Sequence, residues 1–114
     1  MDDFFKVLAD ETRLRCLAII LEHKEVCVCE LVHALRLPQS KISRHLSIMK
    51  LNNIVSQRRH GQWVLYSMHP ELTAFKKSII ATTVKELRMN SRFIEDNKKL
   101  LQMSDRPDIG DTHV

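Results

Sequence analysis

Apolar residues recur at helical spacing in the first quarter of the chain. The pattern predicts a short helix over residues 3–9 and a second helix from Glu11 to about Glu22, with Asp10 in place as its N-cap. Apolar positions of the second helix follow the i, i+3, i+4, i+7 repeat, at Leu14, Leu17, Ala18 and Leu21. We expect this helix to lie in the core.

A helix-turn-helix is predicted next. A third helix is expected from about Cys27 to Leu35. The residues after it lead into Pro38, which favours an extended residue before it and suits the first turn of a fourth helix that reaches about Asn52. Two helices joined by about three residues form this motif. The fourth helix is expected to bury Ile42, Leu46 and Met49.

The opposite face of the fourth helix carries small polar side chains and cations. Small hydroxyl residues allow a helix to lie close to base edges in the major groove of DNA. An ordinary solvated helix face has the same polarity, so this face alone leaves both interpretations open. The candidate DNA contacts on this helix are Gln39, Ser40, Lys41, Ser43, Arg44 and His45.

A two-stranded wing is predicted from Ile54 to Met68, a segment rich in Val, Ile, Trp and Tyr. It is interrupted once, at His60-Gly61, where a hairpin turn needs a residue with positive φ. The base of the wing is expected to be anchored by Val55, Val64 and Tyr66. The tip carries candidate contacts to phosphates or to the minor groove, namely Arg58, Arg59, His60 and Gln62.

Helical apolar spacing continues to the end of the domain. A last long helix is expected to start at Pro70, and its pattern resumes at Phe93 and reaches Leu101. This is more apolar surface than one small domain needs, so we expect a homodimer formed through the N- and C-terminal helices. The candidate interface residues are Phe4, Phe5, Leu8, Leu72, Phe75, Ile79, Thr83 and Leu87. We expect one domain over residues 1–103 and a disordered tail over 104–114, which is polar and contains Pro and Gly.

The charge distribution adds a partner to this picture. All 14 acidic residues lie outside Leu31–Pro70, so that segment carries a charge of +6 and the rest of the chain carries −2. Acidic side chains would repel phosphates, and a surface that faces a polyanion lacks them. We therefore expect double-stranded DNA as a partner, on a mainly α winged helix-turn-helix with a small β-hairpin.

Other classes of protein receive less support. A winged-helix module that binds proteins and has no affinity for DNA is the alternative, and the acid-free segment argues against it. An enzyme is not expected, because we find no glycine-rich phosphate loop and no recognisable catalytic pair or triad. No apolar run reaches the roughly 18 residues of a membrane span, and the start of the chain lacks the features of a signal peptide, so a cytoplasmic protein is expected.

Two of the three cysteines lie at Cys-x-Cys spacing, at Cys27 and Cys29. The total of three cysteines is odd, and two of them lie close together at Cys-x-Cys spacing. Both observations disfavour a framework of disulfides and favour reduced thiols that bind a metal or metalloid. Residues i and i+2 of a helix are about 200° apart, so both thiols could hold one atom only if the start of the third helix bends or unwinds. Such a distortion would weaken DNA binding by the adjacent helix.

Four motifs together resemble the arsenic-responsive branch of the ArsR/SmtB family of dimeric winged-helix repressors. They are LADETRL over residues 8–14, VCVCEL over 26–31, KISRHL over 41–46 and GQWVLY over 61–66. The resemblance covers about residues 3–88. It implies a homodimer that occupies the operator of a resistance gene cluster and is released by its inducer.

The inducer implied by the resemblance is trivalent arsenic, with antimony as an alternative, bound by Cys27 and Cys29. The branch usually shows Cys-Val-Cys-Asp-Leu-Cys, and here Val32 replaces the third cysteine. Trivalent arsenic suits three thiolates, so the third position is left to Cys16, a small thiol or solvent. Cys16 lies beside Ile19 and Ile20 on the second helix, where a buried core role is favoured over ligation.

A thiol redox switch on the same fold is the main rival to the arsenic hypothesis. In that case Cys27, Cys29 or Cys16 would be oxidised, and oxidation would replace inducer binding as the signal.

Overall fold

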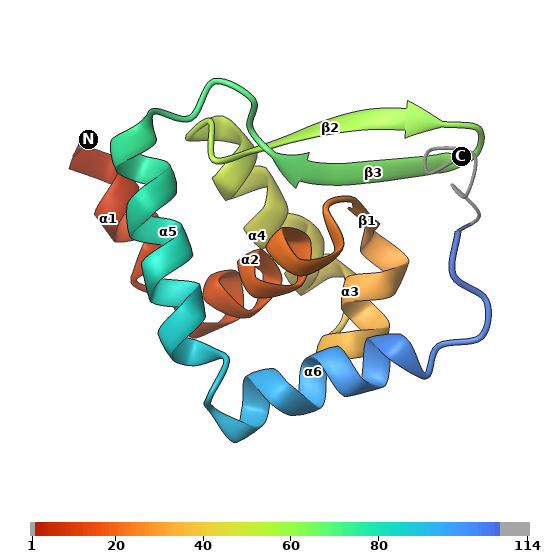
Figure 1. Cartoon of the computed structure of the whole chain (residues 1–114). Helices are drawn as coiled ribbons and strands as arrows, with labels where there is room; N and C mark the ends of the chain where they lie inside the picture. Colours follow the sequence, from red (N-terminus) through yellow and green to blue (C-terminus); the bar gives the residue numbers. More distant parts are fainter. Residues whose placement is uncertain (1, 108–114) are drawn as a thin grey trace.

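The computed structural model describes residues 2–107, which form six helices and a small sheet that lies along one edge of the helical body (Figure 1). The helices are α1 (Asp2–Leu8), α2 (Glu11–His23), α3 (Val28–Leu35), α4 (Gln39–Leu51), α5 (Ala74–Leu87) and α6 (Ser91–Leu101). The strands are β1 (Val26–Cys27), β2 (Val55–His60) and β3 (Trp63–Met68). Within this part of the chain no helix is both long and apolar enough to cross a membrane.

The first half of the fold follows the apolar pattern closely. Asp10 is extended and caps α2 as predicted, because its side chain accepts a hydrogen bond from the backbone N–H of Arg13 at 3.0 Å. The apolar side of α4 is fully buried, as predicted for Ile42, Leu46 and Met49. These three residues join Leu17 and Ile20 of α2 in one continuous core. The expected winged helix-turn-helix is therefore the observed fold.

The predicted two-stranded hairpin is present as β2 and β3, and β1 adds a third strand, so that the antiparallel sheet has the order β1-β3-β2. Cys27, expected at the start of the third helix, instead forms β1 together with Val26, and the two residues pair with Leu65 and Tyr66 of β3. A strand of two residues is too short to produce a hydrophobic periodicity, so sequence reasoning missed it. Gly61 takes the positive φ of +61° that the turn requires.

The base of the wing is anchored by Val55, as predicted, and by Leu65. Leu65 is only 1% exposed, whereas Val64 and Tyr66 are half-buried. Tyr66 packs against the core, as predicted, whereas Val64 does not belong to the core cluster, so the expectation for Val64 is corrected. Alternate side chains of a strand face opposite sides, and the pairing of Val55 with Met68 places Tyr66 on the same face of the sheet as Val55 and Leu65 on the other face.

The predicted long C-terminal helix is two helices. Thr73, and not Pro70, caps α5, since its hydroxyl accepts from the backbone N–H of Lys76 at 3.2 Å. Asn90 caps α6 in the same way through the N–H of Arg92 at 2.8 Å. The break at Asn90 turns α6 back across the molecule, where it packs against α3 and α2 (Figure 1).

Three of the predicted dimer-interface residues belong instead to the core of the single chain. Phe4, Leu8 and Leu72 are 3%, 8% and 8% exposed, because α1 folds back onto the body of the protein. Phe5 and Phe75 remain about half exposed. The other predicted interface residues, Ile79, Thr83 and Leu87, are half-buried.

The C-terminal segment also makes ordered contacts. Arg106 forms an ion pair with the buried Glu30 of α3. Within the predicted disordered tail, Arg106 is therefore bound to α3, whereas Ser104 and Asp105 are exposed, and residues 108–114 are outside the described part of the chain.

A buried ion pair ties α6 to α2. Arg15 donates to both carboxylate oxygens of Asp96, each at 2.8 Å, and also to the backbone carbonyl of Leu35 at the end of α3, at 3.2 Å. The two side chains are 11% and 5% exposed. This one guanidinium therefore joins three helices.

We expect Asp96→Ala to lower the free energy of unfolding by about 3–5 kcal/mol, because the substitution leaves Arg15 as an uncompensated buried charge. The matched control is Glu11→Gln, which breaks the Glu11–Arg92 pair, in which both side chains are more than half exposed. The control should cost only about 0–1 kcal/mol. Urea unfolding followed by circular dichroism measures both, and equal losses would contradict the central role of Asp96.

Candidate DNA-binding surface and thiol site

The exposed face of α4 contains most of the predicted contact residues. Gln39, Ser40, Lys41 and Arg44 are exposed and Ser43 is half-buried, all on the side opposite the core. Pro38 is extended at the N-cap and offers no side-chain hydrogen bond there. The first turn of α4 therefore has no side-chain cap and presents the polar side chains of Gln39, Ser40 and Lys41 to the outside, as a helix that enters a groove requires.

His45 does not belong to this face, and its prediction as a DNA contact is wrong. It is 3% exposed, and its Nδ1 accepts a hydrogen bond from Nη1 of Arg13 at 3.1 Å. Burial, helped by the nearby cations Arg13, Arg44 and Lys41, lowers the pKa of His45. The neutral imidazole fastens α4 to α2. The helical periodicity of α4 gave no indication that Arg13 of α2 lies opposite His45.

Arg13 also fixes the end of α1. Its Nε donates to the carbonyl oxygen of Val7 at 2.6 Å. One side chain thus connects α1, α2 and α4 and holds α4 against the first two helices.

At the wing, Arg59 and Gln62 are exposed and His60 is half-buried beside the Gly61 turn. Arg58 has a different environment from the one predicted. Its Nε and Nη2 bind the two carboxylate oxygens of Glu25 at 2.6 and 2.7 Å. The hydrogen bond from Arg58 lowers the pKa of Glu25.

The pair with Glu25 changes the meaning of the acid-free segment. Glu25 lies outside Leu31–Pro70 in the sequence, yet it folds onto the wing and offsets the charge of Arg58. Arg58 is nevertheless 45% exposed, so a contact between Arg58 and DNA stays a prediction. Sequence reasoning had no signal for this pair, because 33 residues separate its members.

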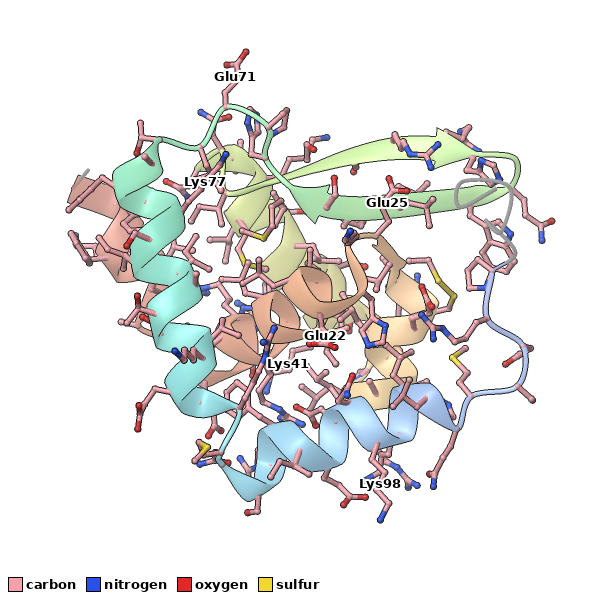
Figure 2. All side chains as sticks on the ribbon, viewed as in Figure 1. Glu22, Glu25, Lys41, Glu71, Lys77 and Lys98 are labelled. Carbon is pink, nitrogen blue, oxygen red and sulfur yellow. A yellow bond between two sulfur atoms is a disulfide. The ribbon has the colours of Figure 1, made fainter. Side chains whose placement is uncertain are left out.

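Cys27 and Cys29 lie side by side at the start of α3, where a disulfide joins them (Figure 2). The structure therefore contains a disulfide in place of the expected reduced thiols. The expectation that both residues lie in regular helix is also wrong. Cys27 ends β1 in an extended conformation and is the N-cap of α3, and only Cys29 is helical. The two sulfurs therefore meet without any unwinding of the helix.

Glu30 completes a capping box around Cys27. Sγ of Cys27 accepts from the backbone N–H of Glu30 at 3.4 Å, and Oε1 of Glu30 accepts from the backbone N–H of Cys27 at 2.8 Å. The other carboxylate oxygen of Glu30 accepts from Nε of Arg106. The spacing Cys-x-x-Glu is that of a capping box with Cys in place of Ser or Thr, a signal that the sequence did contain.

The outer side of this site is a hollow of about 380 Å³ between α3 and the C-terminal segment. Cys29, Val32 and Met103 are among its lining residues. Val32, at the position where the family resemblance calls for a third cysteine, thus faces the hollow beside Cys29 and brings no ligand atom to it.

Cys16 is not part of the thiol site. It is 0% exposed in the middle of α2, and burial raises its pKa to about 12. Within residues 2–107 no group of three or more His, Cys, Asp or Glu side chains is placed to hold a metal ion. The suggestion of Cys16 as a third ligand is corrected, and its alternative role as a small core residue is confirmed.

Comparison with known proteins agrees with this architecture. Residues 10–57, from the N-cap of α2 into β2, match the family described as "Bacterial regulatory protein, arsR family". The arsenic resistance transcriptional regulator ArsR2 of Pseudomonas putida is 43% identical over 106 residues, which cover 92% of this chain and 90% of that protein. The arsenical resistance operon repressor of Escherichia coli is 43% identical over 76 residues, or 67% of this chain and 65% of that one.

A solved structure shares the fold. The transcriptional repressor PagR of Bacillus anthracis superposes with a TM-score of 0.62 at 27% identity, over 72% of this chain and 90% of that chain. The expected winged-helix architecture and the sequence match agree with each other. The chain therefore belongs to the arsR family of bacterial regulatory proteins.

Proposed function

We propose that the chain is an arsenite-responsive transcriptional repressor, which binds operator DNA as a homodimer and releases it when trivalent arsenic, or antimony, binds Cys27 and Cys29. The observation that carries this proposal is the meeting of the two sulfurs at the N-cap of α3. This helix directly precedes α4, to which we assign the role of the recognition helix that contacts DNA. Relatives 43% identical to this chain are named arsenic resistance regulators, which supports the choice of signal.

The chemistry needs the reduced pair. Two thiols and As(OH)3 give a bis-thiolate arsenic hydroxide and two molecules of water, so the exchange consumes no oxidant. Thiolates are the ligands that soft centres prefer. Cys16 lies in the core and Val32 offers no ligand atom, so the third position is left to the hydroxide or a small thiol. No catalytic cofactor is required.

Binding at Cys27 competes with its role as a cap. The sulfur that accepts from the N–H of Glu30 must turn toward the arsenic atom. Loss of an N-cap costs about 0.5–2 kcal/mol. If the DNA-bound form needs the capped α3, arsenic and DNA weaken each other by the same coupling free energy.

We place the interface with the second copy of the chain on the face formed by α1 and α5. Phe5 and Phe75 are exposed there, and two-fold pairing of this face would bury both. A two-fold dimer also presents two copies of α4 to successive turns of DNA.

We expect Cys27→Ser and Cys29→Ser to retain DNA binding and to lose release by arsenite, since each variant lacks one of the two thiolates. Cys16→Ala should retain both properties and serves as the control. The measurement is the fluorescence anisotropy of a duplex, selected from random DNA on the reduced protein, during an arsenite titration. Release that persists in Cys27→Ser would overturn the assignment of the site.

The Cys27–Cys29 disulfide favours one second candidate, a redox-sensing repressor that is released when the pair is oxidised. The same anisotropy assay separates the two functions. Arsenite releases DNA from the reduced protein in the first case, whereas only peroxide does so in the second.

We expect Arg44→Gln to weaken DNA binding and to reduce the slope of log K against log salt by about 0.9, the contribution of one phosphate contact. Arg44 is exposed on α4, whereas the control, Lys98→Gln, removes a cation from α6. Titrations at several salt concentrations measure the slope. Affinity that is independent of salt would instead favour a protein-binding module.

We expect iodoacetamide at pH 8 to modify Cys27 and Cys29 of the reduced protein and to spare Cys16. The thiolate is the reactive form, and burial holds the pKa of Cys16 at about 12, above its ordinary value, so the folded protein keeps this thiol protonated. Mass spectrometry counts the modified cysteines. Cys16 should react once urea unfolds the chain, and its rapid reaction in the folded protein would contradict its placement.

A further inference from the structure

Cys27 shares one row of the wing sheet with Arg58. Cys27 of β1 pairs with Leu65 of β3, and Leu65 pairs in turn with Arg58 of β2. Neighbouring strands lie about 5 Å apart, so the first thiol and the wing arginine are separated by only one strand. The thiol site is therefore continuous with the wing through the backbone of the sheet.

An ion pair makes a second connection between the thiol site and the wing. Glu25, two residues before Cys27, holds Arg58 through both carboxylate oxygens, at 2.6 and 2.7 Å. Segment 25–27 thus contacts the wing in two ways, by strand pairing with β3 and by an ion pair with β2. A movement of this segment moves the wing.

We propose that Glu25 and Arg58 are positioning residues that transmit the state of the thiol pair to the wing, so that inducer binding displaces the wing and not α4. This role rests on the proposed function, because it requires that arsenic binding at Cys27 and Cys29 releases DNA.

The two cysteines belong to elements with unequal anchorage. Cys29 lies in α3, which is held by the buried Leu31 and Leu35, by the packing of α6 and by the Glu30–Arg106 pair. Cys27 ends a strand of two residues, which is also buried but is held by fewer side chains, those of Val26 and Cys27. An atom bound by both sulfurs must be accommodated between them, and the smaller element, β1, is the one that yields.

The recognition helix is held more firmly than the wing. Three fully buried residues and the Arg13–His45 hydrogen bond fix α4 to the core. On β2, by contrast, residues 57–59 are exposed, and Arg59 follows Arg58 directly. A shift of β1 therefore displaces Arg59 relative to the DNA backbone, while α4 stays in place.

The test compares the Kd for DNA with and without saturating arsenite, in the reduced full-length protein. We expect Glu25→Gln to bind arsenite with unchanged stoichiometry. The ratio of the Kd for DNA with arsenite to the Kd without arsenite should be lower than in the wild-type protein by about fivefold or more. The ratio cancels any effect of the substitution on DNA affinity itself. The control, Glu22→Gln, breaks the Glu22–Arg88 pair near the end of α2, three residues before Glu25, and should leave the ratio unchanged.

Two further measurements address the mechanism. Arsenite added to the DNA-free protein should shift the amide resonances of Leu65 and Arg59, and these shifts should shrink in Glu25→Gln. Arg58→Gln, and the double variant with Glu25→Gln, should lower the ratio no further than the single change, because all three remove the same contact. Arg58→Gln also replaces Glu25→Gln if the latter folds poorly.

The outcomes are distinct. If the reduced wild-type protein retains DNA at saturating arsenite, the proposed function fails and this role fails with it. If the wild-type protein releases DNA and both Glu25→Gln and Arg58→Gln release it with the same ratio and the same resonance shifts, only the role of the pair is overturned, and the signal passes through α3 and the turn to α4.

Discussion

The N-cap of α3 is the point on which the arrangement of the thiol site, the sheet and the C-terminal segment depends. Cys27 is both the last residue of β1 and the cap of α3, so its backbone pairs with the wing while its sulfur accepts from the helix. Glu30 closes the cap from the other side and binds Arg106. A change at this sulfur therefore cannot remain local, because the residue takes part in a strand and a helix at once.

Buried charges keep the helices around this point in fixed positions. Arg15 joins α2, the end of α3 and α6 through Asp96 and the carbonyl of Leu35. Arg13 joins α1, α2 and α4 through Val7 and His45. Both arginines lie on α2, so this central helix sets the spacing of the others. The Arg15–Asp96 pair is buried and therefore costly to separate, whereas Arg13 is held by hydrogen bonds to two neutral acceptors.

This rigidity divides the candidate DNA surface into two parts. The face of α4 is fixed by the core beneath it, and its exposed residues keep one orientation. The tip of the wing stands away from the core, whereas its base is anchored by the buried Val55 and Leu65, and the Glu25–Arg58 pair connects β2 to the segment before β1. Regulation by a small displacement is easier to achieve in the second part, since fewer buried contacts oppose it.

The sequence by itself determined the elements whose residues repeat with a regular period. The apolar faces of α2 and α4, the cap at Asp10 and the turn at Gly61 follow from local spacing and residue type, and so does the exposed polar face of α4. Only the tertiary structure decided the strand at Cys27, the burial of His45 and the pairing of Arg58 with Glu25. Each of these depends on a partner that lies far along the chain, and local periodicity carries no information about which distant side chain will face it.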